Sequence, residues 1–420
     1  MTPPDTSPAP ADRTPTDRTP SDRTPTDWTP TDWQARANEA ARSVTSHFGR
    51  RLLFLPGTHL GSVRWPSHRL QNLFRPWHYW WQAHYVDCLV DAGRRELGNG
   101  ATPAARFNGP ANPSAGKLAS RLVTGIRLRN AFTFVNTYYD DMAWLALATL
   151  RLQNLAEETR KPGRRRNARV HKTLTLQFDS ASTDDLGGGT FWSKKRDFKN
   201  TPATAPVALY YARTGQQAKA QRLVDWLNTV LFDQAQGLYV DGARLNAAGE
   251  ITLENAIYTY NQGPVLGALL ELGGEENLSR AATVIRAVDK HLTVPAPAVV
   301  PGSSPDTRTS ILRCDGTGDG GLFTGILCRY LALAALDARL PAGARTTAAE
   351  LVNATAAAFW AGRRTPGDPV FSIHAAQPAD ATYPAGAAVE LSTQLQAWMV
   401  LEAAASLGRA PVTGAAPAAP

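Results

Sequence analysis

Cysteine is scarce in this chain of 420 residues, and its scarcity excludes a fold built on disulfide bonds. The three cysteines, Cys88, Cys314 and Cys328, are too few and odd in number for a disulfide framework. Cys314 and Cys328 can pair only if the protein is exported, and spacing alone does not establish the geometry of that bond. We therefore expect three free thiols.

Long apolar runs and a leader sequence are also missing. No window of about eighteen or more apolar residues occurs, so no transmembrane segment is predicted. The first residues, Met1 to Asp5, lack the basic and apolar regions of a secretory signal peptide. We expect a cytoplasmic protein, or an extracellular one if the true start codon lies elsewhere.

A strong charge of one sign is absent as well. The 44 Lys and Arg residues against 36 Asp and Glu residues leave a net charge of +8, which is mild for this length. The main basic run, residues 161–169, has no aromatic residue interleaved for base stacking. We interpret it as a solvated loop and expect no nucleic-acid partner.

Regular structure is excluded at both ends. Residues 12–31 repeat Asp-Arg-Thr-Pro or Asp-Trp-Thr-Pro every five residues, and proline at that spacing forbids a helix. Residues 1–31 and the Ala/Pro-rich residues 410–420 are therefore predicted to be disordered tails. Residues 32–409 remain as a single domain.

Within that domain, apolar residues recur at helical spacing in twelve segments separated by Gly, Pro and Asn loops. Their predicted spans are 32–48, 77–95, 117–133, 139–157, 168–182, 203–213, 215–232, 258–272, 275–291, 319–337, 345–362 and 391–407. Every second segment, beginning with 77–95, is apolar nearly all round, and the others are amphipathic.

The apolar segments begin about every sixty residues, which indicates repeated helix pairs. Six pairs that close into a ring form an all-α (α/α)6 barrel with an inner and an outer layer. This arrangement predicts burial of Leu145, Leu209, Leu269 and Leu331 on inner helices, and exposure of Arg42, Arg222 and Arg286 on outer ones.

The most informative stretch is residues 136–148, where Asp140 and Asp141 stand between a Tyr pair and Trp144 at the head of an apolar helix. Helix-end amides favour carboxylates there, so capping explains one Asp. A second Asp beside aromatic rings fits a carboxyl pair of unequal pKa, as glycosidic cleavage requires. The alternatives are a structural helix start and a metal site. No EF-hand-type loop occurs, so neither a metal nor a cofactor is expected.

The order Tyr139-Asp140-Asp141-x-Ala143-Trp144 resembles the signature of glycoside hydrolase family 76, the endo-α-1,6-mannanases, whose fold is an (α/α)6 barrel. Further motifs follow in the family's order between Trp33 and Leu407, including 187–192, 259–263 and 325–331. The resemblance implies that Asp140 is the nucleophile and Asp141 the acid/base, whereas the residues alone do not order them. Thr324 stands where the family has Lys.

Aromatic rings and amides within these motifs are the predicted sugar contacts. Core packing is an equal alternative for Trp81, helix capping is one for Asn200, and turn capping is one for Asp315. The full set is Tyr139, Trp81, Trp192, Asn200, Tyr260, Asn261, Gln262, Asp315 and Phe323.

Together these features predict a monomeric retaining glycoside hydrolase that acts on α-1,6-linked mannan or on a mannosylated oligosaccharide or glycolipid. The alternatives are a transglycosylase of the same family, a sugar epimerase on the same barrel, and a non-catalytic mannan-binding protein. An epimerase of this fold uses a His pair on inner helices; His84 supplies one member, but no second His begins another inner segment.

Overall fold

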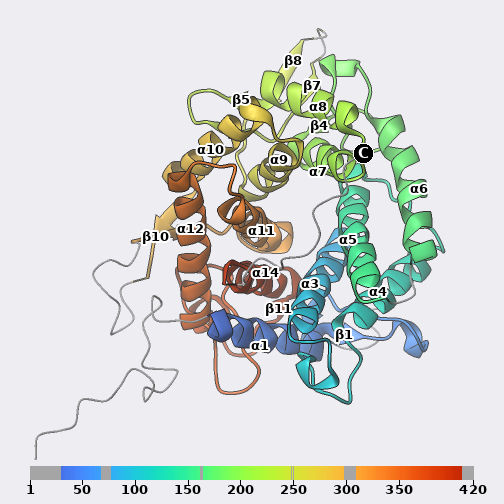
Figure 1. Cartoon of the computed structure of the whole chain (residues 1–420), viewed down its shortest axis with the longest axis vertical. Coiled ribbons are helices and arrows are strands. Elements are labelled where there is room, and N and C mark those ends of the chain that lie inside the picture. Colours follow the sequence, from blue (N-terminus) through green and yellow to red (C-terminus); the bar gives the residue numbers. More distant parts are fainter. Residues whose placement is uncertain are drawn as a thin grey trace, which may run out of the picture.

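The inner layer of the fold is a closed ring of six helices (Figure 1). The computed structural model describes residues 30–67, 77–160, 164–246, 248, 250–297 and 309–408. Each inner helix contacts the next, and the last contacts the first. The inner helices are α3 (Tyr79–Gly98), α5 (Tyr139–Glu158), α7 (Thr201–Arg213), α9 (Thr259–Leu272), α11 (Phe323–Leu336) and α14 (Leu391–Leu407).

Six further helices surround this ring, each packed on an inner partner. The outer helices are α1 (Pro30–Phe48), α4 (Ala115–Arg129), α6 (Arg164–Ala181), α8 (Gln217–Trp226), α10 (Gly274–His291) and α12 (Ala342–Ala361). The pairs follow the chain from α3 with α4 to α11 with α12, and α1 packs on α14. This is the predicted (α/α)6 barrel, with all twelve segments in their expected layers.

Most boundaries differ from the prediction by a few residues, and two of them change an interpretation. α1 begins at Pro30, inside the expected N-terminal tail, and the rest of that tail, residues 1–29, lies outside the described residues. α6 begins at Arg164 instead of residue 168, so most of the basic run is helical and not a loop. Arg is a good helix former, so the three consecutive Arg residues at 164–166 favour this earlier start. The C-terminal tail, from residue 409, also lies outside the described residues.

Short antiparallel strands, which periodicity did not predict, decorate the connections that run from an outer helix to the next inner helix. Strands of two to four residues are too short to show an alternating pattern. The pairs are β1 (Gly49–Arg50) with β2 (Leu60–Gly61), β3 (Arg64–Trp65) with β11 (Val389–Glu390), β5 (Phe232–Asp233) with β6 (Leu238–Tyr239), and β9 (Thr293–Pro295) with β10 (Ser310–Leu312); β4 (Lys199–Asn200), β7 (Gly242–Leu245) and β8 (Ile251–Glu254) form a three-stranded sheet. One end of the barrel, where the inner helices begin, therefore carries the elaborated loops.

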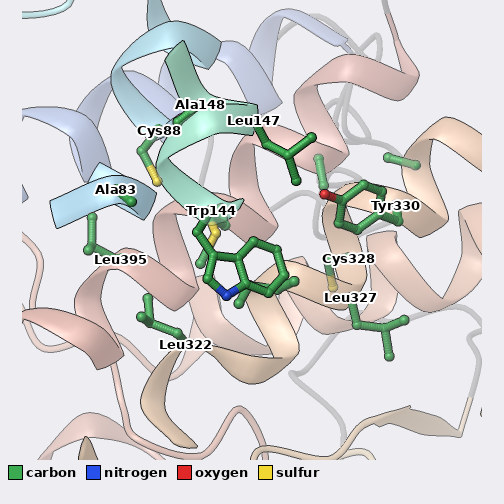
Figure 2. Packing of buried hydrophobic residues seen from close by; sticks show 14 of the residues in the cluster. Ala83, Cys88, Trp144, Leu147, Ala148, Leu322, Leu327, Cys328, Tyr330 and Leu395 are labelled. Carbon is green, nitrogen blue, oxygen red and sulfur yellow. The ribbon is translucent and has the colours of Figure 1, made fainter. Parts of the chain in front are cut away.

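The core lies between and inside the two helix layers. Leu145, Leu209, Leu269 and Leu331 are fully buried, and Arg42, Arg222 and Arg286 are exposed, which confirms the predicted layers. Figure 2 shows Trp144 of α5 packed among side chains of α3, α11 and α14. The cysteines are free, and Cys88 and Cys328 are buried on inner helices.

One helix among the described residues, Gly318–Leu336 with its 3-10 start, is long and apolar enough to span a membrane by composition. It includes α11, an inner helix of the barrel, and 67% of its apolar window is buried in the protein. Burial by its neighbours accounts for its composition.

A buried ionic network ties three inner helices together inside the barrel. Arg329 of α11 contacts Asp87 and Asp91 of α3 at 2.8 Å each, and Arg151 of α5 contacts the same two carboxylates. Burial disfavours the charged form of Asp91, but the two guanidinium groups hold its pKa below the usual range. The four charges compensate one another, so loss of one leaves an uncompensated buried charge.

We expect Arg329→Met to lower the free energy of unfolding by about 3–5 kcal/mol, because two buried carboxylates then share one cation. Denaturant unfolding followed by circular dichroism measures the change. The matched control is Arg286→Met on the exposed face of α10, for which the expected change is within about 0.5 kcal/mol. Equal effects of the two substitutions would contradict a stabilising role for the network.

Candidate active site

Asp140 and Asp141 lie in the first turn of α5, where the sequence predicts them. Tyr138 is the N-cap residue of this helix, but its side chain makes no capping hydrogen bond. Instead, the Tyr139 backbone amide donates to the Trp192 carbonyl at 2.8 Å. Residues 138 and 193 form a β-bridge at the same point. The connection between α6 and α7 thus fixes the start of α5 and brings Trp192 next to the Asp pair.

Trp192 is positioned by the glycine-rich loop before it. Gly188 and Gly189 have positive φ angles, and a Cβ on either would lie within 3.0 Å of the Trp226 ring. These glycines let the backbone approach the Trp226 ring more closely than a side chain would allow. The buried Lys199 ammonium donates to carbonyls of this loop, including that of Gly188 at 2.8 Å. The loop is therefore a rigid support for Trp192.

The Asp140 carboxyl has one bound oxygen and one unbound oxygen. Trp192 Nε1 donates to Oδ2 at 3.2 Å, whereas Oδ1 is buried with no hydrogen-bond partner among the described residues. Burial raises the pKa of Asp140 to about 7, against the lowering effect of the Asp141 amide and the Trp192 indole. This carboxyl changes charge near neutral pH and presents a free oxygen.

The Asp141 carboxyl is more strongly perturbed. Its side chain is buried, and Asn136 donates a hydrogen bond to Oδ2. Burial, followed by the negative charges of Asp140 and Asp319, raises its pKa well above the usual range. At neutral pH the pair therefore holds a proton.

A third carboxylate, Asp319, faces the pair from the 3-10 turn that precedes α11. Its Oδ1 accepts hydrogen bonds from the indoles of Trp80 at 2.9 Å and Trp81 at 2.8 Å. His78 lies 4.0 Å from the same oxygen. These partners hold the Asp319 charge at the barrel mouth, where it raises the pKa values of both catalytic candidates.

Aromatic rings from three inner helices form a cluster beside the acids. The rings of Tyr260 and Phe323 stack with centroids 3.7 Å apart, and Trp80 lies 6.3 Å and 6.2 Å from them. Tyr258 borders the same stack at 5.5 Å from Phe323. Burial and then the charges of Asp241 and Asp140 raise the pKa of Tyr260, so its hydroxyl stays protonated. Stacked rings beside a carboxyl pair suit the C–H faces of a sugar.

Three of the predicted contacts, Trp192, Tyr260 and Phe323, lie at this mouth with the Asp pair. Phe323 is 8% exposed and therefore buried, as are two others that lie nearby. Tyr139 is 3% exposed, and Trp81 is 1% exposed with its ring stacked on His78. The partly exposed neighbour Trp80, one residue before Trp81, carries the ring surface instead. Adjacent residues in the first turn of a helix point in different directions. The sequence alone did not show which of Trp80 and Trp81 faces the site.

The remaining four predicted contacts have partners within the protein. Asn200 caps α7 by accepting from the Ala203 amide at 3.1 Å, and Asp315 accepts from the Thr259 amide and hydroxyl at the start of α9. The buried Gln262 amide bonds both backbone groups of Tyr239 at 2.9 Å. Asn261 donates to Asp241 at 3.3 Å, but its Oδ1 has no partner among the described residues. Polar residues at helix starts serve capping as readily as recognition.

Sequence reasoning did not select Trp80, Asn136, Asp241 and Asp319 as site residues. Helical spacing from Trp77 was the available signal for Trp80. Asn136 and Asp241 come from loops, for which no periodicity applies. Among residues 30–408 with the gaps given above, no group of three or more His, Cys, Asp or Glu residues is arranged to hold a metal ion.

Comparisons with known proteins agree with this geometry. The model of glycosyl hydrolase family 76 matches residues 32–413. An inactive variant of the α-1,6-mannanase GH76A of Salegentibacter sp. HEL1_6, with two consecutive Asp residues replaced by Asn and bound to α-1,6-mannotriose, is 26% identical over 90% of this chain and 100% of its own, with a TM-score of 0.71. The corresponding Ala variant, bound to α-1,6-mannotetrose, is 27% identical over 90% and 99%, with a TM-score of 0.71.

A more distant structure has the same fold. The family 76 mannosidase Bt3792 of Bacteroides thetaiotaomicron is 17% identical over 89% of this chain and 98% of its own, with a TM-score of 0.68. No curated protein sequence matches the chain. Because the family model covers nearly the whole sequence, the chain belongs to glycosyl hydrolase family 76 and is a glycoside hydrolase.

Proposed function

We propose that this enzyme hydrolyses α-1,6-mannosidic linkages with retention of configuration, using Asp140 as nucleophile and Asp141 as acid/base. The observation that carries the proposal is the pair of buried carboxyl groups of unequal, raised pKa in the first turn of α5. The substrate class is supported by the α-1,6-mannotriose and mannotetrose complexes of the Salegentibacter mannanase.

In the first step, the Asp140 carboxylate attacks the anomeric carbon through its unbound Oδ1. The Asp141 carboxyl gives its proton to the departing glycosidic oxygen, so the leaving sugar departs as a neutral alcohol. In the second step, the Asp141 carboxylate takes a proton from water, which attacks the same carbon and releases Asp140. Two inversions at one carbon give net retention.

Product analysis tests the reaction directly. We expect linear α-1,6-mannan incubated in ¹⁸O-water to give shorter oligosaccharides, each with one heavy oxygen at its new reducing end. Longer, unlabelled products would mean that a sugar hydroxyl resolves the intermediate, which is transfer and not hydrolysis. The anomeric configuration, read by NMR before mutarotation, must be α; a β product would contradict retention.

The raised pKa values predict the pH dependence. Asp140 must be ionised and its pKa is raised, so kcat/KM should fall as pH drops below about 7. Asp141 must be protonated, so activity should persist above neutral pH and fall only as its own raised pKa is passed. The measurement is kcat/KM against pH with soluble mannan.

The Asp319→Asn variant tests whether the charge of Asp319 contributes to the raised pKa values of Asp140 and Asp141. It removes a negative charge that raises both pKa values, while the amide oxygen can still accept from Trp80 and Trp81. Both limbs of the profile should move to lower pH. If kcat/KM fell at every pH while the pH profile kept its shape and position, Asp319 would act by holding Trp80 and Trp81 in place and not by its charge.

A further inference from the structure

Exposed large apolar side chains gather at the end of the barrel that carries the active site. Of the twelve found among the described residues, nine lie in connections leading into inner helices, and the other three are Leu176, Leu333 and Leu336. Tyr138 and Trp192 border the Asp pair. The most exposed of the rest are Phe132 at 70%, Phe54 at 69% and Leu53 at 60%. Apolar surface concentrated on one functional face marks an interaction site.

Two loop tips owe their exposure to an unusual backbone. Leu53 and Phe54 have φ angles of 45° and 62°, and Ala131 and Phe132 have φ angles of 51° and 63°. Residues with a Cβ rarely adopt this left-handed region, and bulky ones adopt it least. Two such residues in succession, in each of two loops, turn apolar side chains toward solvent. We call Leu53–Leu55 and Phe132 the apolar tips.

Hydrogen bonds hold both tips in this conformation. The Thr58 hydroxyl accepts from the Leu52 amide at 3.1 Å and donates to the Leu55 carbonyl at 2.7 Å. The Asn130 amide donates to the carbonyls of Thr133 and Val135 at 3.0 Å each. The exposed apolar surface is therefore built into the loops.

Both tips belong to loops that are attached to the same outer helix, α4. The loop of Leu53–Leu55 continues into β2, which contacts α4, and the His59 amide donates to the Arg121 carbonyl of that helix at 3.1 Å. Phe132 follows the end of α4, and the Arg127 guanidinium donates to its carbonyl at 2.9 Å. Both tips thus lie around one outer helix.

The surroundings of the tips are basic. Among the described residues, 49–67 contain three Arg and no Asp or Glu, and 115–138 contain one Lys, three Arg and again no acidic residue. Arg51 and Arg127 are exposed beside the tips. Apolar side chains at the centre of a positive surface match the acyl boundary and the phosphates of an anionic bilayer.

We propose that the apolar tips dock this enzyme on an anionic lipid membrane. Leu53, Phe54 and Phe132 enter the headgroup region, while Arg51 and Arg127 lie against lipid phosphates. Phe132 lies in the short connection from α4 to α5, whose first turn carries the Asp pair, so docking turns the barrel mouth toward the bilayer. The proposal is independent of the sugar that the site accepts.

Vesicle co-sedimentation of the full chain tests the docking. Binding to phosphatidylcholine vesicles that contain phosphatidylglycerol should be at least about tenfold tighter than to phosphatidylcholine alone, and should weaken at high salt. Leu53→Ser with Phe54→Ser should weaken it about tenfold, and Arg51→Gln about fivefold. The matched control is Leu333→Ser with Leu336→Ser at the far end of α11, which should bind like wild type.

Hydrolysis of soluble mannan should be unchanged in the tip variants, which shows that they are folded. The proposal is overturned if the wild type ignores phosphatidylglycerol, or if the control pair weakens binding as much as the tip pair. It is also overturned if light scattering shows a dimer that the tip pair dissociates, because the tips would then be a self-association surface.

Discussion

Replacing Asp140 by Asn is expected to lower kcat on α-1,6-mannan by roughly 10³-fold or more, because an amide oxygen is too weak a nucleophile to form the glycosyl intermediate. An aryl mannoside with a good leaving group should lose turnover equally, since its cleavage needs the nucleophile even though its leaving group needs no proton. The Asn oxygen can still accept the hydrogen bond from Trp192 Nε1, so the start of α5 should keep its structure.

The control for this variant is Asp197→Asn, an exposed residue in the connection that carries Trp192. Its turnover should equal that of the wild type. Calorimetry with α-1,6-mannotriose should show that the Asp140 variant still binds, because the rings of Trp80, Tyr260 and Phe323 are untouched. If the Asp140 variant kept wild-type turnover, Asp140 would have no role in the reaction.

Replacing Asp141 by Asn should give the second large effect, and a selective one. Mannan, whose leaving hydroxyl needs a proton, should lose about 10²–10⁴-fold in kcat/KM. The glycosylation step of an activated aryl mannoside should be largely spared, because its phenolate leaves without protonation. Added azide should then restore turnover by attacking the intermediate without a general base.

The configuration of the azide product makes this result decisive. Attack on a covalent intermediate at Asp140 gives an α-mannosyl azide, whose configuration is retained. A β-mannosyl azide would indicate direct displacement and would exchange the roles proposed for the pair. If kcat/KM fell equally for mannan and for the aryl mannoside, Asp141 would not be the general acid.

The barrel was predictable because its signal repeats. Six apolar segments such as 258–272 and 391–407 match observed inner helices within a few residues, since a helix buried on all sides must be apolar all round. The placement of Asp140 and Asp141 followed from the same pattern. Their pKa values did not, because these depend on burial and on the charge of Asp319, which is far away in sequence.

The sugar contacts were harder to predict for a physical reason. Asn200 and Gln262 stand at helix starts, and Asp315 contacts the start of α9 from a loop; free backbone groups there compete with any ligand for a polar side chain. In the structure, backbone groups hold all three. The choice between Trp80 and Trp81 depends on the rotation of α3 about its axis, which a single sequence pattern does not define to one residue.

The contact between α1 and α14 has a consequence for biosynthesis. These helices are the first and the last of the barrel in chain order, yet they pack side by side. At about 5–20 residues per second, the ribosome needs roughly 20 to 80 s to make the whole chain. During that time α1 lacks its partner, and apolar residues such as Val44 and Phe48 have no complete surface to cover them. The ring can close only after α14 has been made, so chaperone demand should be greatest late in translation.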